Sequence, residues 1–157
     1  MKVKFVVDED FVNYYRPALF IGFPKCSFKC DKENGNKICQ NGKLANEPDI
    51  EVSIDDLIGR FILNSIPKAI VCGGLEPFDS YDDLLELVKQ FRVYTDADIV
   101  IYTGYTEKEL ADRIDEITQY HNIVIKYGRF IPGQQPHKDK VLGVKLASNN
   151  QYAKRYD

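Results

Sequence analysis

The sequence lacks a long hydrophobic run. Its 157 residues are 44% hydrophobic and 29% charged, a composition typical of soluble globular proteins. No apolar stretch approaches the roughly 18 residues that a membrane-spanning helix needs. Met1 leads directly into the strand-like segment KVKFVV, and no small-residue cleavage site follows it. We therefore expect a single domain, residues 1–157, in the cytoplasm and without a membrane partner.

A surplus of positive charge is also absent. The formal net charge is -3, and Lys and Arg are scattered along the chain. Proteins that follow a nucleic-acid backbone present a basic patch or stripe to the phosphates. The sequence therefore predicts no nucleic-acid partner.

Cysteine is scarce, but it is concentrated in one place. Three of the four cysteines lie between Cys26 and Cys39, inside a polar stretch of about residues 24–48. Disulfides are rare in a reducing compartment, so metal binding is the leading explanation for the cluster. Loops this long inside a compact domain are usually functional or disordered, and the cysteines favour function.

Strand-like and helix-like segments alternate along most of the chain. Ser53 and Ser80 each precede apolar residues at helical spacing, with Asp56 and Asp83 in capping-box positions. A third helix is expected near Leu110 to Ile117. The expected strands span 2–7, 18–21, 68–71, 98–102 and 122–126, with a last one indicated over 141–146 before a polar tail. This alternation predicts an α/β fold with a parallel sheet and alternating helices.

Unusual loops follow four of the predicted strands. They are the cysteine stretch, Gly73-Gly74-Leu75-Glu76-Pro77, Thr103-Gly104-Tyr105-Thr106 and Tyr127-Gly128-Arg129-Phe130. The carboxyl ends of parallel strands meet at one edge of the sheet, where α/β proteins place their ligands. One shared site at this edge is therefore expected.

Two kinds of metal site fit the cysteines. Three thiolates can hold three irons of a cubane cluster and leave the fourth iron open to a substrate. A closed zinc site would use the same three residues with Cys72 as the fourth ligand. Cys72 ends a buried strand, however, and a small core thiol suits it better. His121 and His137 are not spaced as a ligand pair.

The Gly73-Gly74 pair also has two interpretations. It is either a tight turn between a strand and a helix or a place where the backbone approaches a ligand closely. Glu76 is either an ordinary surface residue or the anion that receives an ammonium group. The neighbouring cysteines favour the ligand interpretation in both cases.

These segments together resemble the radical-SAM superfamily, and most closely the activating proteins of anaerobic ribonucleotide reductase. Cys26-Ser27-Phe28-Lys29-Cys30 matches the first half of the family's Cys-x3-Cys-x2-Cys motif. Cys39-Gln40-Asn41 resembles its end, after eight residues where the family has two. Gly73-Gly74-Leu75-Glu76-Pro77 resembles the segment that receives the methionine ammonium group, with Leu75 as an extra residue.

Three further segments extend the resemblance over most of the chain. DIVIYTGYTEKEL is similar to the strand of the activases that ends in Thr-Gly-Tyr-Thr. IKYGRF is similar to a Val-Asp-Gly-Arg-Phe segment of the family, with Lys126-Tyr127 where the family has its acidic residue. Ala147-Ser148-Asn149-Asn150-Gln151 resembles a Ser-Ser-Asn-Gln near the end of the family.

The resemblance implies an incomplete β/α barrel of radical-SAM type, with an inserted cluster-binding loop at about residues 24–48. It implies a 4Fe-4S cluster and S-adenosylmethionine as cofactors, and a glycyl-radical enzyme, anaerobic ribonucleotide reductase, as the partner. A flavodoxin- or ferredoxin-type protein would donate electrons. The implied metal ligands are Cys26, Cys30 and Cys39, and the implied cofactor-binding residues are Gly73, Gly74, Glu76, Thr103 and Gly104.

Two alternatives stay open. One is a radical-SAM enzyme that acts on a small molecule, for example in modified-purine biosynthesis, where altered cysteine spacing also occurs. The other is a non-catalytic zinc or iron-sulfur protein that uses the long loop as a structural knuckle.

Overall fold

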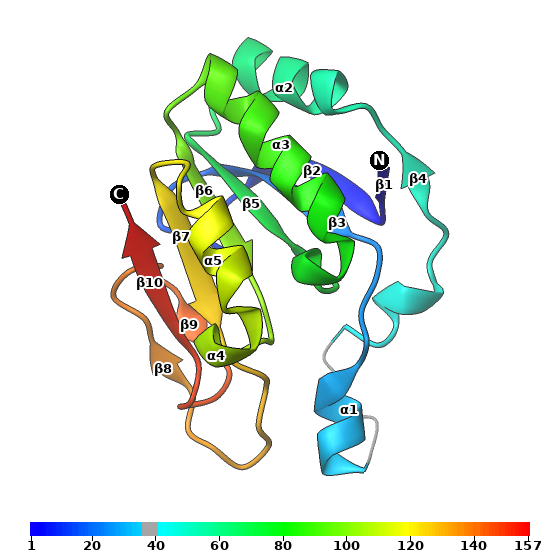
Figure 1. Ribbon diagram of the computed structural model, residues 1–157, viewed down its shortest axis with the longest axis vertical. Helices are drawn as coiled ribbons and strands as arrows, with labels where there is room; N and C mark the ends of the chain where they lie inside the picture. Colours follow the sequence, from blue (N-terminus) through cyan, green and yellow to red (C-terminus); the bar gives the residue numbers. More distant parts are fainter. Residues whose placement is uncertain (36–40) are drawn as a thin grey trace.

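A six-stranded mixed sheet forms the centre of the protein (Figure 1). The computed structural model describes residues 1–35 and 41–157, and it describes only the backbone of Lys29, Cys30 and Asn34. The strand order is β10-β7-β6-β5-β3-β2. In chain order the strands are β2 (Phe5–Asp10), β3 (Ala18–Phe23), β5 (Ala69–Gly74), β6 (Asp98–Tyr102), β7 (Ile123–Tyr127) and β10 (Tyr152–Tyr156).

The four central strands, β3, β5, β6 and β7, run parallel. β5, β6 and β7 contain Ile and Val, and all four strands are buried over nearly their whole length, as expected of parallel strands covered on both faces. The strands expected over 18–21, 68–71, 98–102 and 122–126 are therefore confirmed to within a few residues. The edge strands β2 and β10 pair antiparallel with their neighbours.

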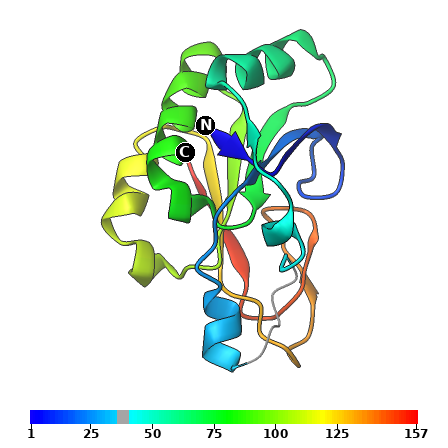
Figure 2. The same cartoon turned by 90° about the vertical axis from the view of Figure 1, so that its right-hand side faces the viewer.

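Helices cover one face of the sheet. They are α2 (Ile54–Leu63), α3 (Tyr81–Tyr94), α4 (Glu107–Leu110) and α5 (Asp112–Ile117), and Figure 2 shows them on one side of the sheet. Their apolar side chains, such as Leu87 and Phe91, pack against the sheet residues Ile70, Ile99 and Ile101 to form the larger core. Burial of this apolar surface is the main source of stability.

The opposite face of the sheet is covered by loops and a small hairpin. The hairpin pairs β8 (His137–Lys138) with β9 (Lys145–Leu146). Tyr14, Leu142 and Leu146 pack there against Val71 and Val100 in a second, smaller apolar cluster. This face leaves room for polar groups near the carboxyl ends of the parallel strands.

The long stretch after β3 contains local structure. It includes α1 (Lys29–Asn34), a 3-10 helix η1 (Leu44–Asn46) and β4 (Ile50–Glu51), which pairs with β1 (Lys2–Val3). In Figure 1 α1 projects below the sheet. The predicted strand over residues 2–7 is divided between β1 and β2.

Three local predictions are wrong. Ser80 does not cap a helix with its side chain, because a 3-10 helix η2 (Pro77–Ser80) runs directly into α3. The third helix is split at Ala111, which has a positive φ of 42°. The last strand of the sheet is β10, whereas the predicted strand at 141–146 reduces to β9. The Ser53 cap is confirmed, since its hydroxyl accepts a hydrogen bond from the Asp56 amide.

The incomplete barrel of radical-SAM type stays a prediction, as does the single domain with its insertion at about 24–48. Among the helices that the structure describes, none is long and apolar enough to cross a bilayer.

Candidate functional site

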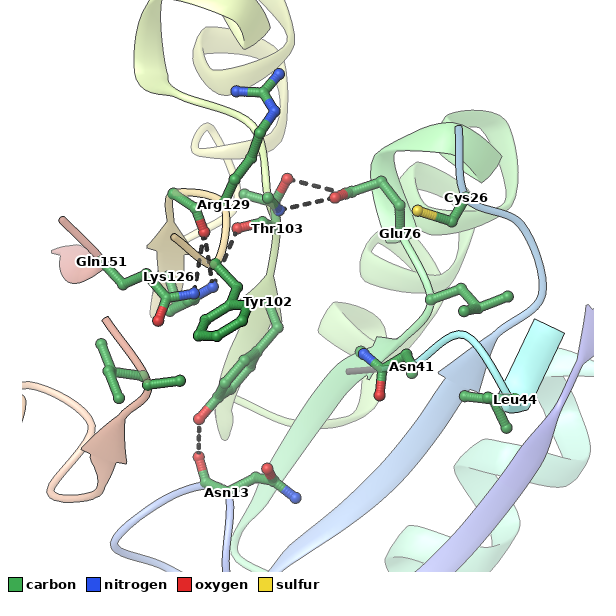
Figure 3. Close-up of a pocket in the computed structure, with 18 of the residues that line it drawn as sticks. Asn13, Cys26, Asn41, Leu44, Glu76, Tyr102, Thr103, Lys126, Arg129 and Gln151 are labelled. Atoms are coloured by element: carbon green, nitrogen blue, oxygen red, sulfur yellow. Dashed lines mark hydrogen bonds between the residues drawn. The ribbon is translucent and has the colours of Figure 1, made fainter. Parts of the chain in front are cut away.

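A pocket of about 420 Å³ lies at the carboxyl ends of the parallel strands. Residues that follow each of the four strands line it, namely Cys26 after β3, Glu76 after β5, Thr103 after β6 and Arg129 after β7. Figure 3 shows Cys26 and Glu76 on one side of the pocket and Lys126 on the other. The expectation that four loops build one site at this edge is confirmed.

Backbone hydrogen bonds hold the start of the cysteine loop against the segment that follows β5. The Leu75 amide donates to the Phe23 carbonyl over 3.2 Å, and the Glu76 amide donates to the Lys25 carbonyl over 2.7 Å. These bonds extend the pairing of β3 with β5 beyond the sheet. Cys26 is therefore fixed close to the Gly-Gly-Leu-Glu segment by the fold itself.

Asp79 makes a further connection to the cysteine loop. Its Oδ2 accepts a hydrogen bond from the Ser27 amide at 2.8 Å, and its Oδ1 accepts one from the Tyr105 hydroxyl at 2.5 Å. One carboxylate therefore links the loops after β3, β5 and β6. The Phe28 amide also donates to Cys26 Sγ at 3.2 Å, and amide donors of this kind stabilise negative charge on a ligating sulfur.

The other two predicted metal ligands are Cys30 and Cys39. The backbone of Cys30 lies in the first turn of α1, and Cys39 lies outside the described residues. No group of three Cys, His, Asp or Glu side chains suited to a metal occurs within the described part of the chain. The ligand set of Cys26, Cys30 and Cys39 therefore stays a prediction.

Glu76 is buried, with 7% of its surface exposed. Its Oε1 accepts hydrogen bonds from the Phe78 amide and the Thr103 hydroxyl at 3.1 and 2.8 Å. Its Oε2 accepts one from the Gly104 amide at 2.8 Å. Burial raises the pKa of Glu76 to about 7, although these three hydrogen bonds act to lower it. The surface-residue interpretation is therefore wrong, because Glu76 is a buried and fully oriented carboxylate.

The packing of the strands requires glycine at position 74 and leaves little room for a side chain at position 73. Gly74 has a φ of 81°, which side chains disfavour, and a Cβ there would come within 2.8 Å of Gly22 Cα on β3. A Cβ on Gly73 would meet the Phe20 ring at 3.0 Å. The close approach of β3 and β5 explains both residues without a ligand. Both still line the pocket, so their predicted contact with a cofactor stays a prediction.

Lys126 is a buried cation that the sequence analysis noted but gave no role. Its side chain points to the pocket from β7, and only 7% of the residue is exposed. Its Nζ donates to the carbonyls of Thr103 and Gly128 at 3.4 and 3.0 Å and lies 5.9 Å from the centre of the Tyr102 ring. A lysine inside an otherwise apolar strand was the available signal, because lysine is rarely buried.

Arg129 connects the loop after β7 with α1 of the cysteine loop. Its guanidinium forms a paired hydrogen bond with the Glu109 carboxylate and lies 3.4 Å from Glu33 of α1. It also stacks over the Tyr105 ring at 5.8 Å. The Gly-Arg segment after β7 thus supports α1 and the loop after β6.

Neither Cys72 nor either of the two histidines lines the pocket. Cys72 is fully buried in the helix-covered core, where burial raises the pKa of its thiol to about 12. This confirms the core-thiol interpretation and argues against Cys72 as a zinc ligand. His121 is exposed beside Asp96, and His137 bonds the Gln151 carbonyl at 2.8 Å.

The sequence matches a family model described as a 4Fe-4S single cluster domain over residues 15–153. The chain belongs to this family. It is therefore a 4Fe-4S cluster-binding domain, and its predicted iron-sulfur chemistry is supported. No curated protein matches the sequence significantly.

Proposed function

We propose that this chain uses its 4Fe-4S cluster to cleave S-adenosylmethionine reductively and thereby activates a glycyl-radical enzyme, the anaerobic ribonucleotide reductase. The observation that carries the proposal is that Cys26 and Glu76 line the same pocket. These are the first predicted cluster ligand and the predicted receiver of the methionine ammonium group. Domains of this family also occur in radical-SAM-associated proteins.

The residues present fit such a cluster. Cys26 opens into the pocket, receives an amide hydrogen bond on its sulfur, and is followed by Cys30 at the start of α1. Cys39 is the third ligand in the proposal. Three cysteine ligands would leave the fourth iron open to the cofactor. When bound, the cluster supplies the electron that splits S-adenosylmethionine into methionine and a 5′-deoxyadenosyl radical.

Glu76 receives the ammonium group in this proposal. A carboxylate offers about four lone pairs, and the structure shows three of those of Glu76 engaged by protein donors. Among the residues that the structure describes, no fourth donor reaches the Glu76 carboxylate, which leaves one acceptor direction for a ligand. Thr103 and Gly104 therefore act through Glu76, because their donors fix the orientation of its carboxylate.

Lys126 gives the pocket its opposite charge. An amino acid ligand carries both an ammonium and a carboxylate group, and Glu76 and Lys126 lie on different sides of the pocket (Figure 3). This separation of charge suits the zwitterionic methionine end of the cofactor. The protein's task is thus to hold and orient the cofactor and to exclude water.

A protein partner is favoured by the mouth of the pocket. Val12 lines the pocket and is 72% exposed, and its neighbour Phe11 is 63% exposed. Exposed apolar groups beside a reactive site suit contact with another protein surface. The Thr103-Gly104-Tyr105-Thr106 segment supports the same choice, because it resembles the activases in particular. A flavodoxin- or ferredoxin-type electron donor completes the proposal.

The test is the formation of 5′-deoxyadenosine by protein reconstituted anaerobically with iron and sulfide and given S-adenosylmethionine and dithionite. We expect product from the wild type and from Cys72→Ala, and none from Cys26→Ala, Cys30→Ala or Cys39→Ala. A protein that retains one zinc ion and forms no product would instead be a structural metal protein.

The partner is tested separately. Addition of anaerobic ribonucleotide reductase should give the electron paramagnetic resonance doublet of a glycyl radical. Cleavage of S-adenosylmethionine without this signal, but with turnover of a small molecule, would favour the small-molecule enzyme.

A further inference from the structure

A second hollow of about 930 Å³ lies on the face of the sheet away from the helices. It is formed by the loop before β3, the turn between β8 and β9, and the end of β10. Figure 2 shows the first two of these segments, in blue and orange, on the side opposite the helices. The lining residues are Tyr14, Tyr15, Arg16, Lys138, Lys140, Val141, Gly143 and Arg155.

Cationic side chains line this hollow, and one of them, Arg155, is ion-paired with Asp157 at 2.7 Å as well as with Asp98 at 2.8 Å. Four of its lining side chains are cationic, namely Arg16, Lys138, Lys140 and Arg155, and within the described residues no acidic side chain lines it. The whole chain has a net charge of -3, so this concentration of cations runs against the overall composition. All four residues are exposed and accessible to a ligand.

The buried carboxylate of Asp98 contacts both arginines, Arg16 and Arg155. It is 3% exposed, and its Oδ1 accepts a hydrogen bond from Arg155 at 2.8 Å. Its Oδ2 accepts one from the Tyr14 hydroxyl at 2.8 Å and lies 3.7 Å from Arg16. Burial acts to raise the pKa of Asp98, but the bonds from Arg155 and Tyr14 outweigh it and leave the pKa lowered. The arginines are therefore held in place before any ligand binds.

Asp139 fixes the turn that carries the two lysines. Its side chain accepts hydrogen bonds from the amides of Val141 and Leu142, each at 2.9 Å, and from Ala153 at 3.1 Å. Its carbonyl accepts one from the Gly143 amide at 2.8 Å. Lys138 and Lys140 are the sequence neighbours of Asp139, so these hydrogen bonds also restrict the backbone of the two lysines.

Gly143 packs the turn against the loop before β3. A Cβ at this position would come within 2.7 Å of Tyr15 Cβ, and its φ of 70° favours glycine. Arg16 in turn stacks over the Tyr15 ring at 5.0 Å. The two walls of the hollow are thus joined by direct contact.

We propose that this hollow binds a phosphorylated small molecule with two or more linked phosphate groups. Of the two arginines, Arg16 is the one placed to pair with phosphate oxygens through two parallel hydrogen bonds, since Asp98 and Asp157 hold Arg155. Lys138 and Lys140 add point charges. The volume is in the range of small-ligand pockets, and Tyr15 offers an aromatic wall beside the cations. The hollow is open to solvent, but its cations are gathered in one place and do not form a stripe, which suits a small molecule better than an extended nucleic-acid strand. The proposal does not depend on the cluster or on S-adenosylmethionine.

The test is isothermal titration of the full-length protein with inorganic tripolyphosphate and with ATP, without magnesium. We expect both to bind, with affinity that weakens as the salt concentration rises from about 0.05 to about 0.3 M. Equal affinities would show that only the phosphates are recognised, and tighter ATP binding would show that the nucleoside contributes too. Either result supports the proposal.

Two variants and one control decide whether the hollow is the site. Lys138→Ala/Lys140→Ala and Arg16→Gln should each weaken binding by about tenfold or more, because each removes charge-assisted bonds to phosphate. Lys89→Ala/Lys108→Ala removes two exposed lysines from the helices on the other face and should have no effect. Circular dichroism establishes that each variant is folded.

Three results would overturn the proposal. They are failure of both probes to bind, equal binding by the variants and the control, and tighter binding of a short single-stranded oligonucleotide than of ATP. The last result would make the hollow a nucleic-acid contact.

Discussion

The two faces of the central sheet differ in what they bury. The helix-covered face contains Leu, Ile, Val and Phe side chains with almost no exposure to solvent. The other face has a smaller apolar cluster, and the pocket beside it holds the buried polar residues Glu76, Thr103, Lys126 and Gln151. Burial of polar groups is costly unless they are hydrogen-bonded. The first face is therefore built for stability and the second for binding.

The largest expected effect concerns the cluster. Cys26→Ala should abolish incorporation of the 4Fe-4S cluster, because an open cubane needs all three cysteine ligands. Cys72→Ala, in the helix-covered core, should retain full iron and sulfide content. Iron and sulfide analysis after reconstitution measures both. A normal cluster in the Cys26 variant would remove Cys26 from the ligand set.

The next effect is on stability. Phe91→Ala on the helix-covered face should lower the free energy of unfolding by about 3–5 kcal/mol, because it leaves a cavity in the core. Tyr102→Phe on the other face removes only the hydrogen bond to the Asn13 carbonyl and should cost about 1 kcal/mol. Urea unfolding of the apoprotein compares them. Similar costs would contradict the division between the two faces.

A third effect is a dependence of cofactor binding on pH. Because burial raises the pKa of Glu76 to about 7, about a tenth of the carboxylates are ionised at pH 6 and about nine tenths at pH 8. Only the ionised form attracts an ammonium group. Affinity for S-adenosylmethionine should therefore rise about tenfold over this range, and Glu76→Gln should bind weakly at both pH values.

The raised pKa of Glu76 has the opposite effect on the stability of the fold, which should fall as the pH rises. The folded pKa of about 7 lies above the ordinary value of 4.5, so stability from the protonated form is complete below about pH 4.5 and is lost as the pH rises through 7. Wild-type apoprotein should thus lose stability over this window relative to Glu76→Gln. A flat difference would show that Glu76 is ionised throughout.

The smallest effect concerns the support of the cysteine loop. Tyr105→Phe removes one of the two hydrogen bonds to Asp79 that connect the loops, at a cost of about 1 kcal/mol. The cluster should still form, but a chelator should remove its iron several times faster. Tyr152→Phe, on the edge strand, is the control. If the chelator removed iron from Tyr105→Phe at the wild-type rate, the hydrogen bond from Tyr105 to Asp79 would not help to retain the cluster.

The sequence predicts the central strands well and the edges poorly. Apolar runs such as Ile99 to Ile101 indicate parallel strands because both faces are buried. β10 was missed, because an edge strand with the sequence YAKRY is mostly exposed and has no clear apolar pattern. The Ser80 pattern predicts a helix cap because the sequence does not reveal that η2 continues into α3.

The site was also predicted in part. The rule that loops after parallel strands share one edge predicts from the sequence that Cys26, Glu76 and Thr103 lie together. The burial of Glu76 and the part played by Lys126 were not foreseen, because both depend on contacts between segments far apart in the chain. The need for glycine at position 74 depends on such a contact too, because a Cβ there would collide with the backbone of Gly22 on the neighbouring strand.

The most direct test of the central claim is electron paramagnetic resonance of the reduced, reconstituted protein with and without S-adenosylmethionine. If the cofactor binds the open iron of a cluster in this pocket, its addition should shift the g-values of the wild type, with a much weaker shift in Glu76→Gln at the same concentration. An unchanged spectrum at saturating S-adenosylmethionine would contradict the claim and leave the chain as an iron-sulfur protein without radical chemistry.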